Sequence, residues 1–91
     1  MSTLTARFRS KGREYSLSLD AACPDRNYDD ENYAEWFVKA EDGRILEVTV
    51  WKDGLGWFTQ DGTAEVYADK GAFEDGLLLD KKHIKLKEQD E

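Results

Sequence analysis

His83 is the only histidine in the sequence and the first candidate for a catalytic base or a metal ligand. It is surrounded by Lys81, Lys82 and Lys85, and neighbouring positive charge favours the neutral form of an imidazole. A general base needs a nucleophile within reach, and a metal site needs further ligands. The sequence near His83 indicates neither, so we interpret it as a solvent-facing strand residue.

Cys23 is the only cysteine, which excludes an internal disulfide and a thiolate-rich zinc site. A nucleophilic cysteine needs a histidine or a helix N-terminus to lower its pKa. The charged neighbours of Cys23 are mainly carboxylates, which have the opposite effect. We interpret Cys23 as a small apolar side chain that anchors a loop.

Residues 25–29 have the D-x-N-x-D pattern that opens a calcium-binding EF-hand loop. The match ends there, because Asp30 stands where the loop needs a glycine and Trp36 where it needs a bidentate glutamate. The sequence also contains no glycine-rich phosphate-binding motif. We therefore predict no catalytic residues, no metal and no cofactor, and expect that the chain is not an enzyme.

The strongest functional feature is a block of carboxylates interspersed with aromatic residues. Its members are Asp25, Tyr28, Asp29, Asp30, Glu31, Tyr33, Glu35 and Trp36. Carboxylates attract a basic partner over distance, and tyrosine and tryptophan often supply the desolvated anchors of an interface. This block is the predicted partner-binding site, and the alternative is a charged loop that only maintains solubility.

The tryptophans Trp36, Trp51 and Trp57 support a second hypothesis. An exposed indole ring can stack on a sugar or another planar ligand. Packing in the core is the more common role for such residues. A small ligand- or carbohydrate-binding domain therefore remains an alternative.

Size and composition restrict the class of protein. A chain of 91 residues with 40% hydrophobic and 12% aromatic residues is sufficient for one folded domain with one core. No apolar run is long enough to span a bilayer, and residues 1–9 lack the apolar core of a signal peptide. We expect a cytoplasmic protein that does not bind a membrane.

The net charge of −7 argues against direct binding to nucleic acid. Positive charge is concentrated in residues 1–19, and negative charge is concentrated in residues 20–35. The acidic part is the stronger of the two, so the expected partner is a protein with a basic surface.

Alternating apolar and polar residues predict the N-terminal elements. Residues 4–9 and 14–19 both alternate, and the polar segment between them contains Gly12, so they predict a β-hairpin. Residues 20–32 lack periodicity and contain the only proline, which predicts a loop with at most one helical turn. Residues 33–40 fit either a helix or a strand, and we favour a strand forming a hairpin with residues 45–51.

The C-terminal half contains closely spaced turn signals. Residues 52–54, 60–62, 69–71 and 74–76 all end in glycine after polar residues, which predicts turns between short strands. A last strand is predicted from residues 77–79, Ile84 and Leu86. We expect residues 88–91 to form a frayed, charged tail after a single globular domain spanning residues 1–87.

These elements predict a mainly β fold, or an α+β fold with one short helix between residues 24 and 36. The expected architecture is a small antiparallel meander that is barrel-like or forms a compact sandwich. Its strand order and oligomeric state do not follow from the sequence.

The functional expectation is a non-catalytic inhibitor or regulator of a partner with a basic, nucleic-acid-binding surface. In size, acidity and lack of catalytic groups the chain resembles small phage-encoded inhibitors of host defence, such as anti-CRISPR and anti-restriction proteins. This resemblance implies that carboxylates would stand in for phosphates, as in a nucleic-acid mimic. A third alternative is a structural subunit whose strand edge pairs with a copy of itself.

Overall fold

The computed structural model consists of one antiparallel sheet and one short helix. It describes the backbone of residues 2–20, 26–29 and 31–90, and the side chains of residues 4–19 and 31–87. The strands are β1 (Ser2–Ser10), β2 (Arg13–Asp20), β3 (Arg26–Asp29), β4 (Tyr33–Lys39), β5 (Ile45–Lys52), β6 (Phe58–Tyr67) and β7 (Leu78–Asp90), and the helix is α1 (Lys70–Asp75). The mainly β class is therefore confirmed.

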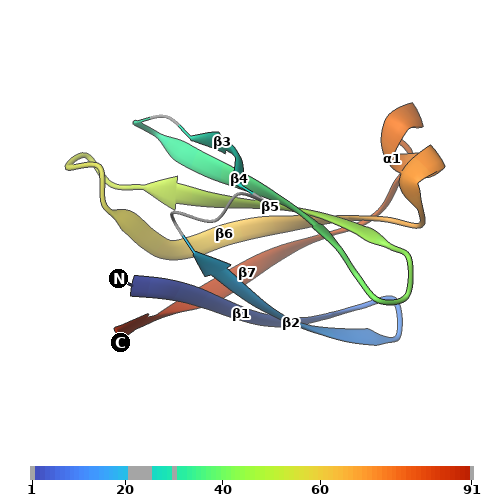
Figure 1. Cartoon of the computed structure of the whole chain (residues 1–91), viewed down its shortest axis with the longest axis horizontal. Coiled ribbons are helices and arrows are strands. Elements are labelled where there is room, and N and C mark those ends of the chain that lie inside the picture. The colour runs from blue at the N-terminus through green and yellow to red at the C-terminus, as the bar shows by residue number, and fades with distance from the viewer. Residues whose placement is uncertain (1, 21–25, 30, 91) are drawn as a thin grey trace.

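The sheet has seven strands in the order β2-β1-β7-β6-β5-β4-β3 (Figure 1). β7 connects its two parts, because residues up to Lys85 pair with β6 and residues from Leu86 onward pair with β1. The sheet curls around the apolar side chains of its inner face. The described strands therefore form the predicted barrel-like antiparallel sheet, which is open between the end strands β2 and β3.

The predicted N-terminal hairpin is confirmed. Lys11 and Gly12 form a two-residue turn with φ angles of 47° and 79°, and both angles lie in the left-handed region. Such a turn matches the right-handed twist of the flanking strands. Alternating residues then direct Leu4, Ala6 and Leu19 into the core.

The predicted hairpin of β4 and β5 is also confirmed, and it contributes much of the core. Its inward side chains alternate along both strands. The core comprises Leu4, Ala6, Tyr15, Leu19, Ala34, Trp36, Leu46, Val48, Val50, Ala64, Val66, Ile84 and Leu86. A cluster of this kind provides the main apolar burial that stabilises the domain.

A polar network joins the β1–β2 turn to the β4–β5 turn. Arg44 donates from Nη1 to the Ser10 carbonyl oxygen at 3.1 Å and to the Tyr15 hydroxyl oxygen at 2.9 Å. The Tyr15 hydroxyl donates in turn to Asp42 Oδ2 at 2.9 Å. The two arms of the curled sheet are therefore fixed to each other at this end.

Two predictions for residues 20–36 are wrong. The segment contains β3 where a loop was predicted, and β3 pairs with β4 through Tyr28 opposite Glu35 and Asp29 opposite Ala34. The short helix was expected in this region, but α1 lies between β6 and β7. Cys23 and the rest of residues 21–25 lie outside the described residues.

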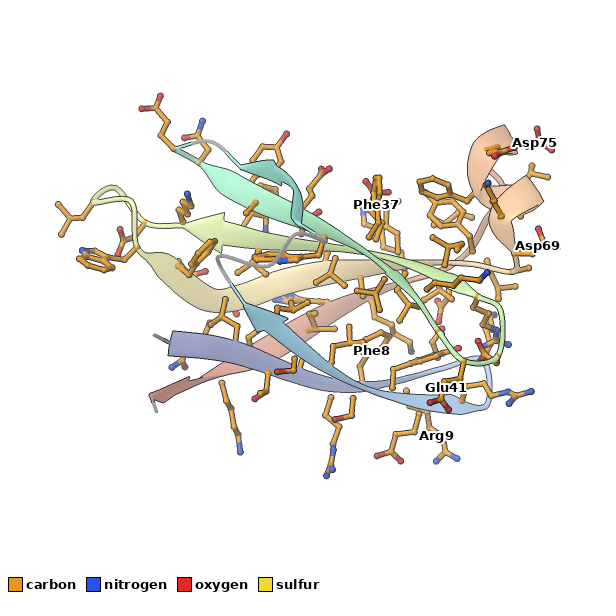
Figure 2. All side chains as sticks on the ribbon, viewed as in Figure 1. Phe8, Arg9, Phe37, Glu41, Asp69 and Asp75 are labelled. Carbon is orange, nitrogen blue, oxygen red and sulfur yellow. The ribbon has the colours of Figure 1, made fainter. Side chains whose placement is uncertain are left out.

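Two turns predicted in the C-terminal half form the ends of α1 instead. Asp69 is the N-cap and accepts a hydrogen bond from the Ala72 amide at 2.8 Å, while Gly76 is the C-cap with φ 71°. Phe73 packs edge-on against Phe37 and Tyr67, with ring centroids 5.1 Å apart in both pairs. Figure 2 shows Phe37 directed toward the helix. This aromatic contact holds α1 against the outer face of the sheet.

Two further predictions for this half are corrected. No turn forms at residues 60–62, because they lie inside β6, where the pairing with β5 shifts register between Val50 and Lys52. Residues 88–90, which were expected to fray, extend β7 and pair with the start of β1. Among the described residues, no helix combines the length and apolarity required to cross a membrane.

Candidate functional site

The structure separates the predicted partner-binding residues. Glu31 is exposed, Tyr33 and Glu35 are partly buried in β4, and Trp36 is only 1% exposed within the core. Tyr28 and Asp29 belong to β3, and their side chains are not described. Asp25 and Asp30 lie outside the described residues.

Trp36 requires a correction as a proposed interface anchor. It alternates with Tyr33 and Glu35 along β4, so it points to the inner face while they point to the outer face. Its ring packs against Phe58 with centroids 5.8 Å apart. A partner cannot contact this side chain without opening the core.

The exposed anchors lie on the β5–β6 hairpin instead. Trp51 is 45% exposed, Leu55 84% and Trp57 71%, and all three come from one connection and its flanking residues. Clustered exposed apolar side chains often mark an interaction site. The sequence indicates Trp51 and Trp57 only for the alternative of ligand binding, and it contains no signal for Leu55.

The connection that carries these side chains is well ordered by Asp53. Asp53 Oδ1 accepts hydrogen bonds from the amides of Leu55 at 2.8 Å and Trp57 at 3.1 Å. The Asp53 amide donates to the Trp57 carbonyl at 2.8 Å, and Gly56 adopts a left-handed φ of 85°. The loop therefore presents Leu55 and Trp57 in a fixed geometry.

The start of β4 lies beside this connection. The Lys52 amide donates to the Asn32 carbonyl at 2.8 Å, and the rings of Tyr33 and Trp51 are 5.4 Å apart. A hollow of about 330 Å³ is lined in part by Glu31, Asn32, Asp53 and Leu55. The start of β4 and the β5–β6 connection both lie at the end of the molecule opposite α1 (Figure 1).

We refer to these exposed apolar and adjacent acidic residues as the hairpin-tip surface. It comprises Glu31, Tyr33, Trp51, Asp53, Leu55 and Trp57. Only Glu31 and Tyr33 belong to the predicted acidic block. The other members come from a connection that is distant in sequence and that the hairpin pairing brings close.

A row of carboxylates crosses the outer face of the sheet from β4 to β6. Glu47 lies directly opposite Glu65, and the charge of Glu35 also acts on it. The pKa of Glu47 is raised, chiefly because partial burial disfavours its charged form and next because of repulsion from these two carboxylates. We call Glu35, Glu47 and Glu65 the acidic row. It continues the predicted acidic block across strands whose register the sequence does not reveal.

Glu47→Gln should stabilise the protein at neutral pH, by about 0.5 kcal/mol in free energy of unfolding. The raised pKa means that folding favours protonated Glu47. The stability that protonated Glu47 contributes is therefore present at low pH and is lost as the pH rises through its folded-state pKa. The gain should therefore vanish at about pH 3.5, where wild-type Glu47 is protonated. Urea titrations of wild type and variant at both pH values measure this gain in the free energy of unfolding. Glu14→Gln on exposed β2 serves as a control, and an equal gain there would contradict this explanation.

His83 is the remaining candidate for chemistry within the described residues. Its side chain is 64% exposed, and its Nε2 lies 3.5 Å from Asp61 Oδ1, which also pairs with Lys85 Nζ at 2.9 Å. Its prediction as an exposed strand residue is confirmed, although sequence analysis did not identify its Asp61 neighbour. Within the described residues, no group of three or more histidine, cysteine or acidic side chains is arranged to hold a metal ion.

Comparisons with protein families, with curated proteins and with solved structures find no match to this chain.

Proposed function

We propose that this chain is a non-catalytic binding module that inhibits or regulates a protein with a basic surface. The observation that carries the proposal is the exposure of Trp51, Leu55 and Trp57 on one hairpin, where Leu55 lines the same hollow as acidic Glu31. Apolar anchors supply affinity in an interface, and surrounding charges select the partner.

The fixed geometry of the hairpin tip supports its role as the anchor. Binding costs free energy when mobile side chains and loops must become ordered. The hydrogen bonds from the Leu55 and Trp57 amides to Asp53 already order this connection. Exposed Trp57 can therefore enter a partner's pocket with little loss of backbone freedom.

The charge distribution supports a basic partner. The net charge of −7 and the acidic row would attract a positively charged surface over distance. A nucleic-acid-binding protein offers such a surface, and carboxylates would occupy the positions of phosphates. In size and acidity the chain is similar to phage inhibitors of the anti-CRISPR and anti-restriction type, and we place it in the cytoplasm with such partners.

Paired charge-reversal variants test the electrostatic part of this proposal. The double variant Glu31→Lys/Glu35→Lys changes the hairpin-tip surface and the acidic row. The control Glu41→Lys/Glu74→Lys makes the same charge change at exposed residues of the opposite end, where Figure 2 shows Glu41. Immobilised wild type and both variants are compared for capture of binding proteins from host lysate at low and high salt.

Wild-type capture should fall as salt rises, because ions screen attraction between exposed charges. The site variant should capture about tenfold less partner at low salt, whereas the control should capture nearly as much as wild type. Equal losses in both variants would mean that only net charge matters. Unchanged capture by the site variant would contradict an acidic interface.

A second candidate function is binding of a planar ligand or a carbohydrate. The exposure of Trp51 and Trp57 favours it, because both belong to the hairpin whose connection lines the 330 Å³ hollow through Asp53 and Leu55. Tryptophan fluorescence during titration with a panel of soluble oligosaccharides measures such binding. Saturable quenching that Trp57→Ala removes would favour this function over the protein-binding module.

A further inference from the structure

The outer edge of β2 pairs with no other strand among the residues that the structure describes. β2 is an end strand of the sheet and pairs only with β1 among the described strands. Ser10 and Arg13 flank the two-residue turn and form a hydrogen-bonded pair. From Arg13 onward, every second residue of β2 directs its backbone N–H and C=O toward β1, and the residues between them direct these groups outward. The backbone N–H and C=O groups that point outward belong to Glu14, Ser16, Ser18 and Asp20.

This edge has few of the features that usually protect an end strand, although Arg13, Glu14 and Asp20 carry charge. β2 contains no proline and no lysine, and its pairing with β1 proceeds without a bulge. The other end strand, β3, has four residues and a register shift. The long, regular edge of β2 is therefore the better template for an added strand.

We propose that two copies of this chain pair through their β2 strands, antiparallel, about a twofold axis at Ser16. Outward groups must face outward groups, so the axis must pass through a residue of β2, and an axis near the middle of the strand, at residue 15, 16 or 17, pairs the most residues. An axis at residue 17 would place Glu14 opposite Asp20 of the other copy, and an axis at residue 15 would pair fewer residues. The axis at Ser16 places Glu14 opposite Ser18.

The charges along the hairpin are complementary in this arrangement. Lys11 lies in the turn before β2, Arg13 is the first residue of β2, and Asp20 is the last. Arg13 Nε also lies 3.9 Å from Asp42 Oδ2 of its own chain. Antiparallel pairing brings the basic end of one copy next to the acidic end of the second, and it does so twice because of the twofold symmetry. This local attraction opposes the repulsion between two chains that each carry a charge of −7.

The apolar side chains on the inner face of β2 are also complementary. Tyr15 of one copy lies opposite Leu17 of the other, and Leu17 is only partly buried in the single chain. Beside it, Val38 and Ala40 line a groove of about 610 Å³ between β2 and the end of β4. The second β2 strand extends this apolar row and removes part of the groove from water. This pairing uses a different edge from the hairpin-tip surface and does not depend on the proposed function.

The first test is the mass in solution over a wide concentration range, measured by light scattering after size-exclusion chromatography. We expect a reversible change from one chain to two. Ser16→Pro removes the N–H at the axis, whereas Ser16→Thr retains it, and an end strand tolerates proline at an outward N–H. The proline variant should raise the dissociation constant by about tenfold or more relative to Ser16→Thr. A wild type that stays monomeric, or a proline variant that dimerises normally, would overturn the proposal.

The second test is disulfide trapping in a Cys23→Ser background. Ser16→Cys places two thiols opposite each other at the axis, within the range a disulfide spans. Glu14→Cys places its two thiols about 13 Å apart along the strands, and they should not join. Mild oxidation should therefore produce a covalent dimer of Ser16→Cys but not of Glu14→Cys. Equal trapping of both variants, or trapping of Glu14→Cys alone, would exclude this register.

Discussion

Trp57→Ala should weaken partner binding by about 2 kcal/mol, close to a thirtyfold rise in Kd, while stability hardly changes. The indole is 71% exposed, so its removal costs the fold little, and a change within about 0.5 kcal/mol is expected. The hydrogen bonds of Asp53 to the loop backbone remain in the variant. Isothermal titration calorimetry with the captured partner and thermal unfolding of the free chain measure the two effects separately.

Leu77→Ala is the matched control for this result. Leu77 is 64% exposed and follows α1 at the opposite end of the molecule, so its truncation removes a similarly exposed apolar side chain. We expect partner binding within about twofold of wild type for this variant. Equal losses in Trp57→Ala and Leu77→Ala would show that the hairpin tip has no special role. Unchanged binding by Trp57→Ala would show that Trp57 does not anchor the proposed interface.

Alternation of side chains explains why the hairpins could be predicted from the sequence. In β2, Tyr15 and Leu19 are buried at alternate positions, and the two-residue turn at Gly12 fixes the register with β1. The same local signal resolved the ambiguity of residues 33–40 in favour of a strand. Such patterns depend on neighbours only a few residues apart, so the sequence contains them in full.

The helix was missed because its capping residues are also turn residues. Asp69 and Gly76 serve equally well in tight turns and at helix ends. A six-residue helix is too short to be stable by itself and depends on tertiary packing. That packing comes from Phe73 against Phe37 and Tyr67, which are distant in the sequence.

The candidate site could be predicted only in part, because it depends on both strand orientation and register. Glu35 and Trp36 are neighbours in sequence, yet they occupy opposite faces of β4. Once residues 33–40 are interpreted as a strand, the alternation of Trp36 with Val38 indicates that Trp36 faces the core. The meeting of Glu47 with Glu65 requires the pairing of β5 with β6, which no local pattern contains.

Gly62 shows how a turn signal can have another physical cause. It lies inside β6, buried opposite Val50 beside the register shift of the β5–β6 pair, and its backbone has no left-handed φ. A Cβ atom built there would overlap the carbonyl oxygen of Thr49 and lie 3.2 Å from Leu86 Cδ1. Glycine is therefore required by the close approach of β5, and not by a turn.

Gly62→Ala should consequently destabilise the domain by about 2 kcal/mol or more, because the neighbouring backbone of β5 must move to accommodate the methyl group. Gly54→Ala is the matched control, since a Cβ there has no atom within 4 Å and the φ of Gly54 is not left-handed. That variant should stay within about 0.5 kcal/mol of wild type or gain slightly, because alanine restricts the unfolded chain. Urea unfolding of both variants at neutral pH measures the difference. If Gly62→Ala unfolds at the wild-type midpoint, β6 does not approach β5 as closely as described, and residues 60–62 would again be candidates for a turn.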